Sequence, residues 1–188
     1  QFPREVKESI RLNVSPDSFD INSIQAYSPK GRKVMLILQC SKEKPYSKSR
    51  IHRNVMNFLE SKGITMSEIE LVTLSGLFGP VPQSYERTPV ILQYDYALTM
   101  RAKRRIKLLA TRLSRFIERC HSNFEVIVAY IGSKPYREVV NIVNRKTASR
   151  IILLPKKPRK SVSSELLRRE HLEELAATIA SILKIVKQ

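Results

Sequence analysis

Five side chains that can carry chemistry lie close together between residues 40 and 52. Cys40 is followed by Lys44, Tyr46, Ser49 and His52, so one short segment supplies a thiol, an ammonium, a phenol, a hydroxyl and an imidazole. A thiol is a good nucleophile only as its thiolate, and its pKa falls from about 8.5 when a cation or a helix N-terminus is near. Lys44 and the start of a following helix could both have this effect, while His52 could transfer protons. The segment therefore indicates nucleophilic or acid–base chemistry centred on Cys40.

Each of these residues also has an ordinary structural explanation. A Cys at the end of an apolar strand is commonly a small packed hydrophobe. The Lys-Pro-Tyr sequence can simply form a turn, and Ser49 can act only as a helix N-cap. Residue types alone therefore favour packing over catalysis for Cys40, and only the shared spacing of the cluster argues for chemistry.

The elements that must position this cluster are those of an α/β fold. Residues 34–40 (VMLILQC) form a nearly continuous apolar run, which is typical of a strand buried on both faces, and helical spacing follows from about residue 49 to Gly63. The Gly and Pro residues between 76 and 89 predict a long irregular connection. Further strands are expected at residues 69–74, 90–94, 124–131 and 151–154, and further helices at residues 99–120, at residues 136–146 and from about residue 163.

This alternation predicts a mostly parallel sheet of about four to five strands with helices on both faces. Residues 1–30 show no sustained period, so we expect an irregular lead-in followed by a single α/β domain over residues 31–188. The apolar stripe of the last helix, from Leu172 to Val186, is expected to pack against the core. Ligands of open parallel sheets bind at the carboxyl ends of the strands. Because Cys40 lies at such an end, we expect the cluster to face a ligand crevice.

The charge of the chain favours a polyanionic partner. There are 34 Lys and Arg against 17 Asp and Glu, a formal net charge of +17, and the pI is about 10.2. Contacts from Lys and Arg to phosphates release counterions and supply most of the sequence-independent affinity for nucleic acid. On the helix at residues 99–120, basic residues cover the surface outside the apolar face, although some could simply be solvated. The candidates for phosphate contacts lie on that helix and in a later loop: Arg101, Lys103, Arg104, Arg105, Lys107, Lys156, Lys157, Arg159 and Lys160.

Several classes of protein are disfavoured. No apolar run approaches the roughly 18 to 20 residues of a membrane span, and no signal-peptide pattern opens the chain. Two cysteines, Cys40 and Cys120, are too few for a disulfide framework and favour a reducing compartment, so a cytoplasmic location is expected. The spacing of His52, His121, His171 and the cysteines predicts no metal site, and no cofactor is expected. The chain begins with Gln rather than Met, which allows it to be a piece of a longer protein.

The spacing of the cluster is similar to that of a known motif. Cys40, Lys44, Pro45, Tyr46, Ser49 and His52 match in their offsets the motif Pro-Cys, three residues, Lys-Pro-Tyr, two residues, Ser, two residues, His. Residues 26–55 thereby resemble the catalytic core of the archaeosine synthase family. Gln39 stands where that family usually has Pro. A looser resemblance continues to about residue 98, through a Gly-Pro-Val-Pro segment that ends at Pro82, then Glu86 and Tyr94-Asp95.

The resemblance implies modification of archaeal tRNA at 7-cyano-7-deazaguanine in the D-loop. In this family, free lysine is joined through its side-chain nitrogen to the nitrile, and a radical-SAM partner enzyme cleaves the adduct to archaeosine. The resemblance also implies a fold similar to uracil-DNA glycosylases. Longer members carry an RNA-binding domain of the PUA type that is not visible here, so RNA must be held by this domain's basic surface, by a separate domain or subunit, or by parts absent from this chain.

The resemblance assigns roles within this chemistry. A Cys40 thiolate could add to the nitrile carbon and form a thioimidate that the amine displaces, or Cys40 could only position a direct attack by the amine. Lys44 or Tyr46 could stabilise the developing nitrogen anion, and His52 or Asp95 could accept the proton of the incoming ammonium. Asp95 could instead form a hydrogen bond to the guanine-like edge of the base or to the amino group of the substrate. The remaining motif positions are expected to contact the substrate: Pro45, Tyr46, Ser49, Pro82 and Glu86.

Two rival functions remain open. One is a non-catalytic tRNA-binding subunit of a tRNA-modification complex, and the other is a glycosylase-like hydrolase. A binding subunit has no need for Cys40, Lys44 and His52 together. A glycosylase would need a carboxylate or an Asn to activate water. The cluster therefore favours an amidine-forming transferase.

Overall fold

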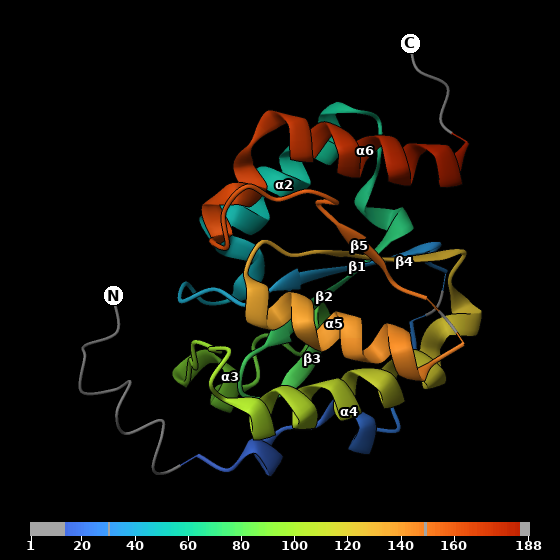
Figure 1. The fold of residues 1–188 in the computed structure, drawn as a ribbon. Coiled ribbons are helices and arrows are strands. Elements are labelled where there is room, and N and C mark those ends of the chain that lie inside the picture. Colours follow the sequence, from blue (N-terminus) through green and yellow to red (C-terminus); the bar gives the residue numbers. More distant parts are fainter. Residues whose placement is uncertain (1–13, 30, 149, 185–188) are drawn as a thin grey trace.

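The apolar run before Cys40 forms the central strand of a sheet in the computed structural model, which describes residues 14–29, 31–148 and 150–184 (Figure 1). The strands are β1 (Val34–Gln39), β2 (Ile69–Ser75), β3 (Gly79–Pro82), β4 (Val126–Tyr130) and β5 (Ile152–Leu154). Their order in this 5-stranded sheet is β3-β2-β1-β4-β5. Only β3 runs antiparallel to its neighbour among these strands. The mostly parallel α/β sheet predicted from the sequence is therefore confirmed.

Helices cover both faces of this sheet. They are α2 (Arg50–Ser61), α3 (Pro89–Gln93), α4 (Lys103–Cys120), α5 (Lys134–Lys146) and α6 (Arg169–Leu183). Side chains alternate along a strand, so Leu36 and Leu38 of β1 pack with α2 and α6, while Met35 and Ile37 pack with α4 and α5. Figure 1 shows the two pairs of helices on opposite sides of the strands. No helix in the described ranges is long and apolar enough to cross a membrane.

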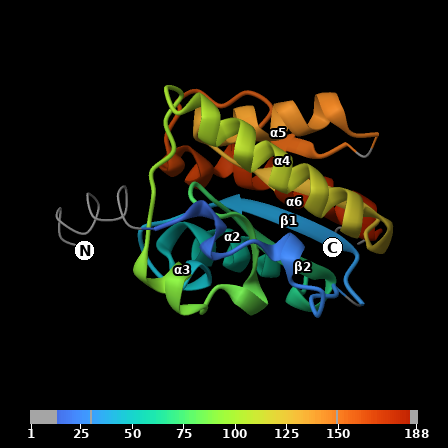
Figure 2. The same ribbon diagram turned by 90° about the horizontal axis from the view of Figure 1, so that it is seen from below.

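Two predictions about the segment between β2 and α4 are wrong. The strand expected at residues 90–94 is the short helix α3, which begins at Pro89, a residue well suited to the first position of a helix. The connection expected to be irregular contains β3, in which Pro80 and Pro82 are tolerated because β3 is an edge strand. Residues 94–102 then connect α3 to α4. They run along the side of the molecule where the carboxyl end of β1 lies (Figure 2).

The other elements differ from the predictions mainly at their ends. The helix α4 begins at Lys103 rather than near residue 99. The last helix, α6, begins at Arg169 and is preceded by a 3₁₀ segment, Ser163–Leu167. Its apolar stripe is buried from Leu172 to Ile179, which confirms the predicted packing there, whereas Val186 lies outside the described residues.

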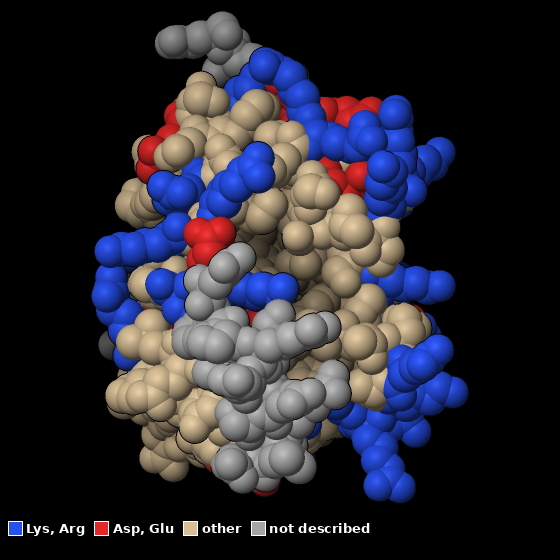
Figure 3. Space-filling model, turned by 90° about the vertical axis from the view of Figure 1, so that its left-hand side faces the viewer, with Lys and Arg blue, Asp and Glu red and all other residues tan. Residues whose placement is uncertain are grey.

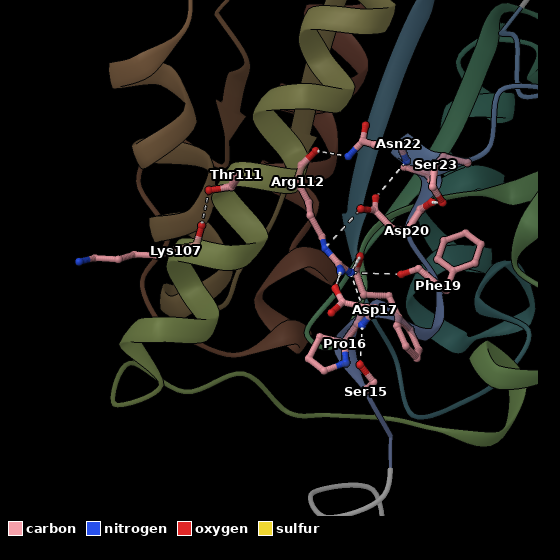
Figure 4. A network of polar contacts seen from close by, with 12 residues as sticks. Ser15, Pro16, Asp17, Phe19, Asp20, Asn22, Ser23, Lys107, Thr111 and Arg112 are labelled. Atoms are coloured by element: carbon pink, nitrogen blue, oxygen red, sulfur yellow. Dashed lines mark hydrogen bonds and ion pairs between the residues drawn. The ribbon is translucent and has the colours of Figure 1, made fainter.

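The lead-in is tied to the domain by a buried arginine of α4 (Figure 4). The Nη1 atom of Arg112 donates hydrogen bonds to the carbonyl oxygens of Pro16, Phe19 and Phe78, and its Nη2 lies 2.6 Å from a carboxylate oxygen of Asp17. The expectation that the basic residues of this helix face outward is therefore wrong for Arg112. Residues 14–29 contain only two short 3₁₀ turns, and residues 1–13 of the expected lead-in lie outside the described part of the chain. The lead-in adds three side chains to the core: Phe19, Ile21 and Tyr27.

Candidate active site at the carboxyl ends of the strands

A cleft opens where the chain leaves β1 and β4 toward opposite faces of the sheet. These adjacent parallel strands are followed by α2 on one face and by α5 on the other, so their loops diverge, and such a switch point is where open α/β sheets bind ligands. The cleft has a volume of about 610 Å³. Its lining residues lie in five stretches of the chain, within residues 39–43, 50–52, 95–98, 133–136 and 162–167. Figure 3 faces this end of the molecule and shows a hollow with Lys and Arg side chains on several sides.

Cys40 lines the cleft and contacts a tyrosine from α5. Its Sγ atom lies 2.9 Å from the hydroxyl oxygen of Tyr136. Burial raises the pKa of the Cys40 thiol, and the nearby carboxylate of Asp95 raises it further, whereas Lys44 and the Tyr136 hydroxyl act in the opposite direction. The lowering expected from Lys44 is therefore outweighed, and the thiol is protonated at neutral pH.

Lys44 and Asp95 form a buried pair behind the thiol. The Nζ atom of Lys44 lies 3.4 Å from Oδ1 of Asp95, donates a 2.6 Å hydrogen bond to the carbonyl oxygen of Ser41 and sits 4.1 Å from the centre of the Tyr46 ring. Burial lowers the pKa of Lys44, and Asp95 opposes this effect. Asp95 lines the cleft, while Lys44 does not. Lys44 is thus placed to hold Asp95 rather than to touch a ligand directly.

His52 joins the start of α2 to the end of β2. Its Nδ1 lies 2.8 Å from the hydroxyl of Ser49, the N-cap of α2, and its Nε2 lies 3.1 Å from the hydroxyl of Thr73. Burial lowers the pKa of His52 to about 4, with a smaller contribution from the positive charge of Lys44. Both ring nitrogens are occupied, so a neutral imidazole lines the cleft with its polar atoms already paired.

The residues expected to contact the substrate lie behind the cleft wall. Tyr46 is buried and its ring stacks on that of His52, with ring centroids 6.3 Å apart. The carboxylate of Glu86 is buried and accepts hydrogen bonds from the backbone N–H and the hydroxyl of Ser47. The cleft lining includes none of the five predicted contacts, which are Pro45, Tyr46, Ser49, Pro82 and Glu86. These residues shape the loop after β1, and their contact with substrate stays a prediction.

Comparison with known proteins places the chain in a family. Residues 18–177 match a family described as "Domain of unknown function (DUF5591)". The chain belongs to this family. It is also 25% identical over 134 residues to the archaeosine synthase of Methanocaldococcus jannaschii, and 26% identical over 147 residues to that of Haloferax volcanii. These matches cover 70% and 73% of this chain but 22% and 24% of the relatives, so the chain spans less than a quarter of their length.

A solved structure shares the fold. The crystal structure of AF0587, a protein of unknown function, matches with a TM-score of 0.56 and 23% sequence identity. The match covers 79% of this chain and 44% of that one. At this identity, the likeness concerns the arrangement of the helices and strands.

Sequence reasoning missed the contribution of α5 to the candidate site of this DUF5591 chain. Tyr136 lies in the first turn of α5, and its hydroxyl also contacts the backbone of residues 94–102, where it accepts a long 3.4 Å hydrogen bond from the N–H of Leu98. Gly76 makes this packing possible, because a Cβ there would overlap the carbonyl oxygen of Tyr96 and lie 2.8 Å from the Tyr136 hydroxyl. The available signal was a Tyr at the start of a helix after a buried strand, but strand order is needed to place it beside Cys40.

The predicted basic residues lie on two separate parts of the surface. Arg101, Lys103, Arg104 and Lys107 are exposed, and the guanidinium of Arg105 lies over the Tyr96 ring at 4.4 Å. The four basic residues between 156 and 160 are also exposed.

The loop at residues 156–160 is fixed by a buried carboxylate, Glu165, which accepts a 2.8 Å hydrogen bond from the backbone N–H of Arg159. This bond and contacts with His171 and Arg168 lower the pKa of Glu165 to about 2. The described ranges contain no group of three or more His, Cys, Asp or Glu side chains placed to hold a metal ion.

Proposed function

We propose that this chain is a catalytic module of the archaeosine synthase type, which joins lysine to the nitrile of 7-cyano-7-deazaguanine in the D-loop of tRNA. The observation that carries the proposal is the position of Cys40, the first residue of a motif similar to that family's, in a cleft at the switch point of the sheet. The similarity to two archaeosine synthases supports a role in tRNA modification. The cleft volume of about 610 Å³ suits a bicyclic base together with an amino-acid side chain.

The proposed reaction is an addition followed by a displacement. The Cys40 thiol adds across the nitrile, so that a sulfur–carbon bond forms and the thiol proton passes to the nitrile nitrogen. The neutral side-chain amine of lysine then attacks the same carbon, the carbon–sulfur bond breaks, and a proton from the amine returns to sulfur. The product is an amidine. All atoms of both substrates are retained, and no oxidant or reductant is needed.

Different cleft residues act on the thiol and on the amine in this reaction. The resting thiol of Cys40 holds the proton that the nitrile nitrogen requires, and the Tyr136 hydroxyl at 2.9 Å can donate a hydrogen bond to sulfur as it becomes negative. Asp95 reaches the cleft and is held by Lys44, so it can bind the ammonium of the incoming lysine and take up its proton. In a second form of the mechanism, the amine attacks directly and Cys40 only positions the nitrile.

The basic surface supports the proposal for a tRNA substrate. A base in folded tRNA must be extruded to reach a cleft, at a cost of roughly a few kcal/mol, and phosphate contacts can offset that cost. Lysine and arginine side chains lie on several sides of the hollow in Figure 3. We further propose a base pocket of the kind found in uracil-DNA glycosylase-like folds, and a cytoplasmic site of action. Free lysine is the proposed co-substrate. A radical-SAM enzyme would act on the adduct. A separate RNA-binding domain or subunit could bind the same tRNA.

Two observations favour a second function, a non-catalytic tRNA-binding subunit. The pKa of Cys40 is raised rather than lowered, and Gln39 replaces the Pro of the similar motif. A domain of this kind would present the basic surface and leave the chemistry to another protein.

The decisive experiment supplies tRNA that carries the nitrile base together with isotope-labelled lysine. We expect mass spectrometry of the nucleosides to show lysine attached to the base with the wild-type chain and with Cys120→Ala, since Cys120 is buried at the end of α4. Cys40→Ser should lose the product if the thiol is the nucleophile. Full activity of Cys40→Ser would establish direct attack by the amine. Intact tRNA binding without any labelled product would refute the transferase and support the binding subunit.

A further inference from the structure

Gln39, the last residue of β1, bridges two strands at the floor of the cleft. Its side-chain oxygen Oε1 accepts hydrogen bonds from the backbone N–H groups of Gly132, at 3.1 Å, and Ser133, at 3.0 Å. These residues follow β4 and lead into α5. The residue as a whole is 8% exposed, and it lines the cleft together with Cys40.

These two bonds fix the orientation of the carboxamide. A backbone N–H can only donate, so the side-chain atom that receives two of them must be the oxygen. The NH₂ group of Gln39 is therefore on the opposite side of the carboxamide. A carboxamide held in this way cannot exchange its oxygen and nitrogen without losing both bonds.

The NH₂ group of Gln39 has no partner among the residues that the structure describes. No hydrogen bond links Nε2 of Gln39 to another residue in the ranges that the structure describes. The nitrogen is not sealed in the interior either, because the unpaired side-chain atoms that are fully buried in those ranges are Asn22 Oδ1, Arg105 Nη1 and Ser114 Oγ. A donor that is oriented, unpaired and open to the cleft is available to a ligand.

We propose that the Gln39 NH₂ group donates a hydrogen bond to the nitrogen of a nitrile when Cys40 Sγ adds to the neighbouring carbon. Negative charge develops on that nitrogen as the sulfur–carbon bond forms, and a fixed donor in a partly buried site stabilises it. The thiol proton of Cys40 then completes the imine N–H of the thioimidate, so the carboxamide itself gives up no proton. The identity of the nitrile substrate rests on the proposed function, whereas the donor role concerns the cleft itself.

The proposed donor role depends on a position at which this chain differs from the similar motif. A Pro at position 39, as in the similar motif, offers no side-chain donor and no acceptor for the N–H groups of Gly132 and Ser133. The alternative role for Gln39 is purely structural, with the oxygen joining β1 to the start of α5 and the NH₂ group idle.

The variant Gln39→Glu separates these two roles. A carboxylate can still accept both backbone N–H bonds, so the bridge to α5 is kept, but an oxygen replaces the donor that faces the cleft. Gln39→Met removes both ends of the amide and serves as the comparison. Melting temperatures should therefore fall more for Gln39→Met than for Gln39→Glu.

The test uses two small probes that react with Cys40 in the full chain. The first, 2-cyanopyrimidine, adds to a thiol through its nitrile and places charge on nitrogen, while iodoacetamide alkylates the same thiol without charging a nitrogen. Both rates depend equally on the fraction of thiolate, so their ratio corrects for any change in the pKa of Cys40 caused by the new carboxylate. Mass spectrometry of the Cys40 peptide measures both adducts, and Cys40→Ala is the blank.

We expect both variants to lower the ratio of nitrile addition to alkylation by about tenfold or more, since loss of one such donor costs about 10²- to 10³-fold in comparable sites. A ratio in Gln39→Glu that equals the wild-type ratio would overturn the proposal, as would a wild-type chain that is alkylated by iodoacetamide but does not add to the nitrile. Neither probe needs tRNA or lysine. A Gln39-dependent nitrile reaction without lysine transfer would therefore keep this inference and refute only the proposed substrate.

Discussion

Acidification should destabilise this protein through one histidine, His52. The imidazole titrates with a pKa of 6.5 in the unfolded chain and about 4 in the folded one, because burial disfavours its charged form. Between these two pH values the unfolded chain binds more protons, so stability falls as the pH falls. The contribution of the neutral His52 is complete above about pH 6.5 and is lost progressively toward pH 4.

The size of the effect follows from the two pKa values. Their difference corresponds to about 3.4 kcal/mol in full, of which about 2 kcal/mol is lost by pH 5. Urea unfolding at pH 7 and at pH 5, with the wild-type chain and with His52→Gln, isolates this contribution from those of the carboxylates. Glutamine cannot titrate but can still bond to Ser49 and Thr73, the two partners of the ring. The free energy of unfolding of the wild type relative to the variant should therefore decrease by about 2 kcal/mol.

The same pair of proteins tests the role of His52 in catalysis. A group with a pKa near 4 is poorly matched to proton transfer at pH 7. We therefore expect the pH dependence of the proposed lysine transfer to lack an inflection from His52 above pH 5. Two unfolding free energies that change in parallel from pH 7 to pH 5 would refute the reasoning, because His52 would then titrate alike in both states.

Three further perturbations probe the thiol, the lead-in and the basic surface. Tyr136→Phe removes the hydroxyl at 2.9 Å from Cys40 Sγ, which should raise the thiol pKa further. Loss of this hydrogen bond to the charged sulfur should slow alkylation by iodoacetamide at pH 8 about tenfold. Arg112→Met leaves three carbonyl oxygens without their donor and should cost about 3 kcal/mol in urea unfolding. Replacing Lys103 and Arg104 together with Ala should reduce the slope of log affinity for tRNA against log salt by about one for each phosphate that the variant no longer binds.

Matched controls make these outcomes specific. Arg115 is an exposed arginine on the same helix as Arg112, and its change to Met should alter stability by no more than about 0.5 kcal/mol. Equal losses from both variants would contradict the role of Arg112.

Arg145 and Lys146 are exposed at the far end of α5, so their replacement removes the same charge away from the cleft. An identical salt slope for the two double variants would exclude Lys103 and Arg104 from the proposed tRNA contacts. An unchanged alkylation profile in Tyr136→Phe would exclude a hydrogen bond from its hydroxyl to the Cys40 sulfur.

The strands and long helices could be predicted because their patterns are local. The run before Cys40 could bury both faces only in the middle of a sheet, and it became the central strand β1. The prediction for the segment between Gly76 and Pro89 was wrong. Gly and Pro residues normally indicate irregular structure, but an edge strand tolerates them. Arg112 was misplaced for a similar reason. A basic residue on a helix is normally solvated, and only the carbonyl groups brought to it by the lead-in make burial favourable.

By itself, the sequence determined the position of Cys40 at a strand end and the order of the polar groups after it, because these depend on neighbouring residues. It could not determine the strand order, which brings Tyr136 and Gly132 beside Cys40 and Gln39. It also could not give the balance of burial and charge that raises the pKa of Cys40, lowers that of His52 and leaves Lys44 behind the cleft wall. Solvent exclusion is a property of the packed domain, so only the tertiary structure decided which groups of the cluster face a ligand.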